Sequence, residues 1–183
     1  MEDTTISVIG ILIASILMFI GPLVLIADRS DDISQLVVQT ATAEFVDEVV
    51  KSGRITADNY QKLVSSLQSS GNTYDVDMEV KILDENTSKR VTDDNYSKIG
   101  QNTYYSIFTS QIEDKIGESA RNTTNNVSGK LILKQGDGIS VTVKNSSRTL
   151  SQTLKSFYYN ATEGDLHIIV ATSSGTVAIN GRT

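Results

Sequence analysis

The chain begins with a run of 24 residues, positions 4–27, that carries no charged side chain. A helix rises 1.5 Å per residue, so this run would be about 36 Å long, enough to cross a hydrocarbon core of about 30 Å. It is longer than a signal-peptide apolar region and lacks a basic start and a small-residue cleavage site, so we expect it to be retained. A retained apolar helix either lies in a bilayer or packs against copies of itself, because both surroundings leave the backbone satisfied internally.

Gly21 and Pro22 lie inside this apolar run, and Pro22 is the only proline of the chain. Proline lacks a backbone donor, and its ring clashes with the carbonyl group four residues earlier. These residues therefore predict a helix kink or a locally melted turn around residues 18–22. A tolerated kink of a membrane helix and a bendable point of an assembled helix both fit this pattern.

The net charge of −6 lies entirely on residues 1–53, which hold two basic and eight acidic residues, whereas the rest of the chain is neutral. Basic residues are concentrated nowhere, so we do not expect nucleic acid as a partner. Arg29 alone, by the rule that basic residues stay cytoplasmic, places the C-terminal domain inside, and a cleaved basic leader would reverse that orientation. The chain has no cysteine, which excludes disulfides and thiolate metal sites.

Apolar residues continue beyond the uncharged run at spacings of three and four, which predicts an amphipathic continuation of the same helix. These positions are Ile33, Leu36, Val37, Ala41, Phe45, Val46 and Val49. Gly53 is expected to end the helix as a C-terminal cap. We therefore expect one helix of roughly 45–50 residues, in which residues 1–27 project and residues 28–53 pack one face on a head domain of residues 54–183. The acidic side chains of the second half are expected to be solvated: Asp31, Asp32, Asp47 and Glu48.

The remainder of the chain predicts an α+β head with an antiparallel sheet and short helices. Thr56 is a suitable N-cap for a helix over residues 57–69. Strict alternation predicts a half-buried strand over residues 74–83, with Tyr74, Val76, Met78, Val80 and Ile82 inward. Short helical patterns follow over residues 104–116, where a mixed segment is the alternative, and over residues 149–159.

Two hairpins are predicted in the second half of the head, each from a pair of strand patterns around a turn-forming sequence. The first joins residues 130–134 to residues 139–144 through Gly136-Asp137-Gly138. The second joins residues 166–171 to residues 176–179 through Ser173-Ser174-Gly175. Polar segments over residues 84–102 and 121–129 are expected to be loops.

Candidates for catalysis or cofactor binding are few. A Ser-His-Asp hydrolase needs a histidine beside a positioned serine, but His167 is the only histidine and lies in an alternating segment typical of a strand. Gly136-Asp137-Gly138 is not followed by the lysine of a phosphate-binding loop and fits a turn. We therefore expect no catalytic residue, no metal and no cofactor. Two acidic groups fit a solvated face better than a calcium loop: Asp84, Glu85, Asp93 and Asp94, and Asp75, Asp77 and Glu79.

Six Asn-x-Ser/Thr triplets are candidate glycosylation sites. They begin at Asn86, Asn95, Asn122, Asn126, Asn145 and Asn160. Most fall in predicted loops, as glycosylation requires, although chance alone predicts several in a chain this rich in Asn, Ser and Thr.

The apolar helix with Pro22, its amphipathic continuation and the small head that contains strands together resemble a type IV pilin or pilin-like protein, over the whole chain. Residues 53–60, 74–80 and 136–145 are in addition similar to the TadE-like proteins found with Tad-type export machinery in Gram-positive bacteria. In such families the apolar helix first anchors the subunit in the membrane. An ATPase-driven machine then moves the subunit into a filament, where these helices form the core.

The resemblance implies an extracellular pilus-like filament for adhesion, motility or surface interaction. Its partners would be copies of the chain, the membrane before assembly and the export ATPase machinery. The family usually carries a glutamate at position 5, where this chain has Thr5, and the nearest acids, Glu2 and Asp3, could neutralise the terminal amine of a neighbour. The expected assembly interface is Glu2, Asp3, Ile9, Leu12, Ile13, Ile16, Leu17, Phe19, Ile20, Leu23 and Val24.

Two other functions remain open. A single-pass membrane-anchored extracytoplasmic protein, whose head binds a ligand or partner, would give detergent-solubilised monomers or small oligomers and no filaments. A minor, tip-located or secretion-associated pilin-like protein would be made in few copies. An enzyme is a distant fourth possibility, and it would lose its activity on replacement of His167 by alanine.

Overall fold

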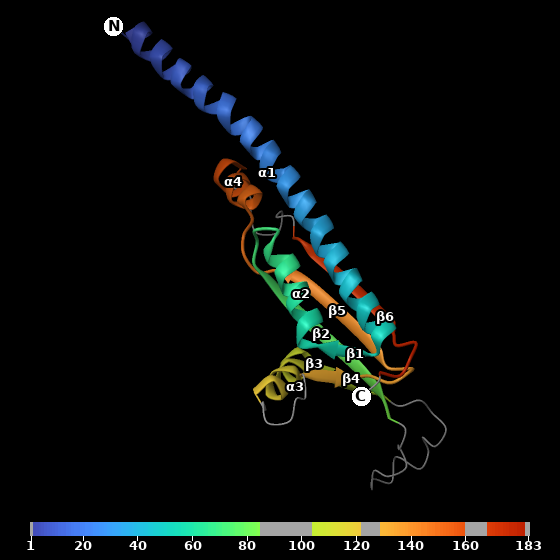
Figure 1. The fold of residues 1–183 in the computed structure, drawn as a ribbon. Coiled ribbons are helices and arrows are strands. Elements are labelled where there is room, and N and C mark those ends of the chain that lie inside the picture. The colour runs from blue at the N-terminus through green and yellow to red at the C-terminus, as the bar shows by residue number, and fades with distance from the viewer. Residues whose placement is uncertain (1, 85–103, 122–128, 160–167, 182–183) are drawn as a thin grey trace, which may run out of the picture.

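A computed structural model describes residues 2–84, 104–121, 129–159 and 168–181. The fold is α+β, as predicted: a long N-terminal helix projects from a head of antiparallel strands and short helices that pack on its second half (Figure 1). His167 and most of the two predicted polar loops lie outside the described residues. The same holds for five of the six candidate glycosylation sites, at Asn86, Asn95, Asn122, Asn126 and Asn160.

The N-terminal helix α1 runs from Glu2 to Ser52 as one element of 51 residues. The prediction of a single helix, apolar first and amphipathic later, is therefore confirmed. The helix continues through Pro22 without interruption, so the prediction of a locally melted turn is wrong. Proline removes a single backbone donor, and the ladder of hydrogen bonds on either side holds the helix together. The kink at Gly21 and Pro22 stays a prediction.

Gly53 ends α1, as expected from its place after the last apolar position. Its φ of 64° lies in the left-handed region, and its N–H donates to the carbonyl oxygen of Val49 at 2.8 Å. Strand β1 (Arg54–Thr56) and helix α2 (Ala57–Gln68) follow directly. Thr56 caps α2 in a reciprocal pair: its Oγ1 accepts from the Asn59 N–H at 3.2 Å, and Asn59 Oδ1 accepts from the Thr56 N–H at 2.8 Å.

The described residues of the head form two antiparallel sheets. The larger has the strand order β3-β2-β5-β6, and the smaller pairs β1 with β4. The remaining strands are β2 (Tyr74–Leu83), β3 (Tyr104–Phe108), β4 (Lys130–Ile132), β5 (Gly138–Asn145) and β6 (Val170–Thr176), and the remaining helices are α3 (Thr109–Arg121) and α4 (Leu150–Tyr159). Residues 104–116 thus form a strand followed by a helix, which is the mixed alternative.

Both predicted hairpins are wrong. Strand β4 pairs with β1, and β5 pairs with β2 and β6, so the segment around Gly136 turns between two sheets. Residues 173–175 lie inside β6, which runs unbroken from Val170 to Thr176. Turn-forming residues occur in this strand because one side of it faces solvent, while Gly175 lies where a Cβ would come within 2.7 Å of the Val50 Cγ2 on α1.

The hydrophobic core lies between the larger sheet and the second half of α1, with α2 and α3 completing the cover. Val38, Phe45 and Val49 of α1 are buried against the sheet, as predicted for a helix that packs one face on the head. Gln35 of α1 also pairs with the outer edge of β6: its Nε2 donates to the Val170 carbonyl oxygen at 2.7 Å, and the Val170 N–H donates to its Oε1 at 3.1 Å. Among the described residues no strand pairs with this edge of β6, and the contact covers part of it.

Tyr60 connects α2 to α3 by a side-chain hydrogen bond. The Tyr60 hydroxyl donates to Glu113 Oε1 at 2.6 Å. Partial burial, and then the hydrogen bond and charge of Glu113, raise the pKa of Tyr60 above its ordinary value. The tyrosine therefore remains the neutral donor of this bond well into alkaline conditions.

Candidate functional site

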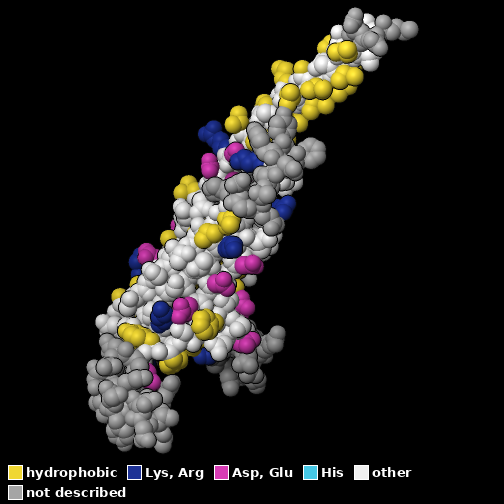
Figure 2. Space-filling model, turned by 180° about the vertical axis from the view of Figure 1, so that it is seen from behind, with side chains coloured by type: hydrophobic (Ala, Val, Ile, Leu, Met, Phe, Trp, Pro, Cys, Tyr) yellow, Lys and Arg dark blue, Asp and Glu magenta, His cyan; other side chains and the backbone are white. Residues whose placement is uncertain are grey.

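The surface of α1 is the main candidate for a functional site. Within the described residues, one helix is long and apolar enough to cross a membrane, Thr4–Ser52, and none of its most apolar stretch is buried inside the protein. Figure 2 shows hydrophobic side chains gathered on the projecting half, whereas charged side chains of both signs are scattered over the head. An apolar surface of this size requires a lipid or protein cover.

Most residues of the expected assembly interface are exposed on this projecting half. Ile20 and Val24 are partly buried, because they share a helix face with Ala27, which packs against the head. The exposed members are Ile9, Leu12, Ile13, Ile16, Leu17, Phe19 and Leu23. Glu2 and Asp3 lie in the first turn of α1. Participation of all these residues in assembly stays a prediction.

A line of exposed apolar side chains follows α1 at intervals of seven residues. We call Leu12, Phe19, Ile26 and Ile33 the outer seam; their side chains are 58–77% exposed. Seven residues return almost to the same side of a helix, and this repeat is the one by which helices pack lengthwise against each other. Leu36, one turn beyond Ile33, is 63% exposed. The seam therefore extends from the projecting half onto the part of α1 that carries the head.

The structure corrects the predicted orientation of this second half. Ile33 and Leu36 were expected to pack on the head, but both are exposed. The buried side begins instead with Ala27, Asp31 and Ser34 and continues through Val38. Two of these residues are polar, so the spacing of hydrophobic residues alone predicts the wrong buried positions at this point of the helix. The seven-residue spacing of Ile26 and Ile33 with Phe19 is the sequence signal that would have placed them on the outer seam.

Two acidic residues of α1 hold helix α4 at the point where the apolar run ends. Asp31 is only 6% exposed, and its Oδ2 accepts from the Thr149 hydroxyl at 2.6 Å. Asp28 accepts from the Ser151 hydroxyl, and its Oδ1 lies 2.6 Å from the Lys155 Nζ. The expectation that Asp31 is merely solvated is therefore wrong. Burial of its carboxylate is tolerated because the hydroxyl supplies a partner.

Removal of this carboxylate should weaken the attachment of α4 to α1, which Asp28 continues to hold through Ser151 and Lys155. In the variant Asp31→Ala the Thr149 hydroxyl loses its acceptor in a buried place, which costs about 1–3 kcal/mol. We expect amide hydrogen exchange in α4 to become about tenfold faster or more in the detergent-solubilised full chain. Asp32→Ala is the matched control, because Asp32 is the next residue and is exposed. Equal exchange in the two variants would contradict the assigned contact.

The other residue groups singled out in the sequence show no ligand-binding arrangement in the described part of the chain. There, no group of three or more His, Cys, Asp or Glu side chains is placed to hold a metal ion. Asn145, the candidate glycosylation site that is described, uses its side chain in the fold: Nδ2 donates to the Ser147 carbonyl oxygen at 3.0 Å, and Oδ1 accepts from the Ile169 N–H at 3.1 Å. A glycan on Asn145 would be attached to the same Nδ2 nitrogen that makes the first of these bonds.

A long, exposed apolar N-terminal helix with an antiparallel sheet packed against its second half is a pilin-like architecture. The same features are consistent with a membrane-anchored protein. The sequence matches no protein-family model, and neither a curated protein nor a solved structure is significantly similar to it.

Proposed function

We propose that this chain is the structural subunit of an extracellular pilus-like filament. The apolar halves of α1 pack together in the filament core, and the heads face outward for adhesion, motility or surface interaction. Before assembly the helix anchors the subunit in the membrane, and an export ATPase machine of the Tad type supplies the subunits. The resemblance to type IV pilins and the pilin-like architecture support this proposal.

The observation that carries the proposal is the length of the exposed apolar surface. Exposed apolar side chains occur along α1 from Ile6 to Leu36, about 45 Å of helix, whereas a bilayer offers about 30 Å of hydrocarbon. The exposed Arg29 and Asp32 interrupt them beyond Ile26. Asp28 and Asp31, with α4 bonded to them, mark the end that would lie in water, because charged groups are costly within the hydrocarbon. Ile33 and Leu36 would then remain exposed in a membrane-anchored monomer.

A second copy of the chain is the cover that fits these residues. If neighbouring helices pack side by side with an axial shift, the apolar half of one copy lies against the outer seam of another. Such a contact joins two different parts of the same surface, so it does not close on itself and propagates into a helical polymer. The outer seam supplies the regular spacing for helix packing along this contact.

The variant Ile33→Asp separates the filament from the single-pass alternative. Ile33 lies beyond the segment that spans a membrane, so the change should leave membrane association intact. A carboxylate buried between two helices is strongly disfavoured, and we expect at least about a tenfold loss of filament mass in sheared cell-surface material. Membrane fractionation and electron microscopy of the same cells measure the two effects.

Ile179→Asp is the control for this test, since Ile179 is an exposed isoleucine of the head far from the outer seam. It should assemble normally. A wild-type amount of filament from Ile33→Asp would contradict the proposed cover of the outer seam by a second copy. The absence of filaments from the unmodified chain would favour the single-pass anchor.

A further inference from the structure

The larger sheet has an outer face that is turned away from α1. Alternate residues of a strand point to opposite faces, and Gly175 faces Val50 on α1, so Ser174 and Thr176 lie on the outer face. Cross-strand register then aligns a row of four residues on this face, one from each strand: Phe108, Glu79, Ser140 and Ser174. The next row contains Asp77, Thr142 and Thr172.

The first hollow on this face has a volume of about 560 Å³ and combines an aromatic ring with polar groups. Phe108 lies at its side with 58% of its surface exposed. Asp77 and Glu79 contribute carboxylates, and Ser140 and Thr142 contribute hydroxyl groups. An exposed phenylalanine beside hydrogen-bonding groups is unusual on the solvent side of a sheet, where polar residues normally alternate with core residues.

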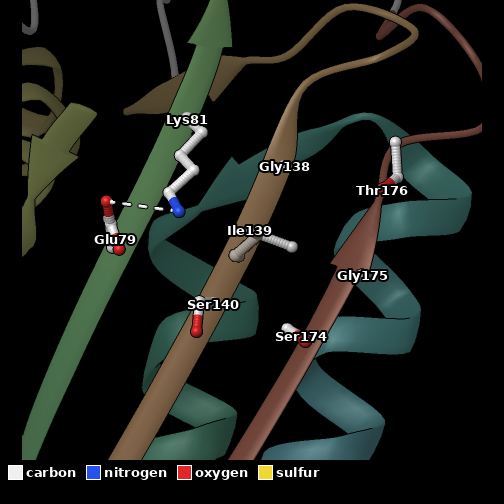
Figure 3. Close-up of a pocket in the computed structure, with 8 residues that line it drawn as sticks. All are labelled: Glu79, Lys81, Gly138, Ile139, Ser140, Ser174, Gly175 and Thr176. Atoms are coloured by element: carbon white, nitrogen blue, oxygen red, sulfur yellow. Dashed lines mark ion pairs between the residues drawn. The ribbon is translucent and has the colours of Figure 1, made fainter. Parts of the chain in front are cut away.

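A second hollow of about 470 Å³ adjoins the first, because Glu79 and Ser140 line both. Figure 3 shows its lining residues on three neighbouring strands. Gly138 has no side chain in the middle of this surface, and Ser174 and Thr176 add two further hydroxyl groups. The two hollows together form a strip across the sheet, aromatic at one side and rich in hydroxyl groups at the other.

We propose that this strip, from Phe108 across Glu79 and Ser140 to Ser174, binds a hydroxyl-rich glycan without acidic groups. The apolar face of a sugar ring packs on an exposed aromatic ring, while its hydroxyl groups donate to carboxylates and exchange hydrogen bonds with serine and threonine. An extended strip matches a chain of several sugars better than a single compact molecule, which would need an enclosed pocket.

The charges select the class of glycan. The first hollow is lined by two carboxylates and by no basic residue among those described. Lys81, in the second hollow, lies 3.9 Å from Glu79 and partly offsets it, as the dashed line in Figure 3 marks. These carboxylates would therefore repel a uronic or sialic acid, whereas they would not repel a neutral or amino-bearing sugar. This inference does not depend on filament assembly, because the outer face of the sheet belongs to each head.

Titration calorimetry of the full chain tests the proposal, in a phosphocholine detergent whose head group carries no sugar. The probes are two neutral hexasaccharides, cellohexaose and chitohexaose, and the acidic hexagalacturonate. We expect at least one neutral probe to bind with a dissociation constant of about 1 mM or tighter, and hexagalacturonate to bind at least about tenfold more weakly. Binding of neither neutral probe, or equal binding of the acidic one, would overturn the proposal.

The variants assign the binding to the strip. Phe108→Ala should raise the dissociation constant of the neutral probe by about tenfold or more, and Glu79→Gln should raise it as well. Tyr105→Ala is the control, because Tyr105 is an aromatic residue of the same strand on its opposite face. Thermal unfolding of each variant verifies that the head remains folded. Unchanged affinity in Phe108→Ala, or an equal loss in Tyr105→Ala, would contradict the assigned surface.

Discussion

Replacement of Ile16 by aspartate is expected to abolish filaments while leaving the head folded. Ile16 lies near the middle of the apolar half of α1, about half exposed and remote from the head. An aspartate at the centre of an apolar helix costs about 2.5–3.5 kcal/mol in a membrane setting, and a filament core repeats that cost in every subunit. Electron microscopy of sheared surface material should show no fibres, and the thermal unfolding of the solubilised head should match the wild type.

Ile16→Leu is the conservative control, because it keeps the side-chain volume and apolar character. It should assemble normally. Since Ile16→Asp also weakens membrane insertion, membrane fractionation must accompany the microscopy. Filaments of normal length and number from Ile16→Asp would show that the apolar half of α1 does not form the core.

Replacement of Gly53 by alanine should destabilise the head strongly. At the left-handed φ of 64°, a Cβ costs about 1–2 kcal/mol, and here it would also lie 2.5 Å from the Gly181 nitrogen and 2.7 Å from the Ile179 carbonyl oxygen. Backbone atoms cannot move aside as a flexible side chain can, so overpacking adds about 1–3 kcal/mol. We expect a total loss of about 3 kcal/mol or more in the free energy of unfolding, measured with denaturant on the solubilised chain.

Gly71→Ala separates these two causes. Gly71 also has a positive φ, 81°, but a Cβ there would meet nothing within 4 Å. Its replacement should cost only about 1–2 kcal/mol, from backbone strain alone. Equal losses in the two variants would show that the close approach between residue 53 and residues 179–181 does not stabilise the head.

Local signals in the sequence predicted the elements well. The uncharged run and the spacing that follows it predicted one long helix, Gly53 predicted its end, and Thr56 predicted the start of α2. The alternation over β2 predicted its inward residues, of which Met78 and Val80 are fully buried. Each of these features depends on residues close together in the sequence, so a short segment of the chain is enough to predict it.

Strand pairing could not be predicted in the same way. Strand β4 pairs with residues 54–56, more than 70 positions earlier, and no local pattern encodes that partner. The turn-like sequence at 173–175 lies in a strand because α1 needs a glycine at the contact, a cause that arises from tertiary packing. Local turn propensity is weak enough for such packing to override it.

The candidate assembly surface was predicted in its first half and missed in its second. The uncharged run marks residues 4–27 directly. Beyond this run, Asp31 and Ser34 lie on the buried side of α1 and form hydrogen bonds there. Ile33 and Leu36 therefore lie on the exposed side. A pattern that counts only hydrophobic residues does not predict which polar residues are buried and hydrogen-bonded in a core.

Cryo-electron microscopy of material sheared from the surface of cells that produce the chain tests the central claim most directly. The proposed function predicts a helical fibre whose central density is a bundle of helices, with Phe19 and Ile33 of each copy in contact with neighbouring helices and the heads outside. Recovery of the chain only from the membrane fraction, as a monomer or small oligomer and without fibres, would contradict that claim.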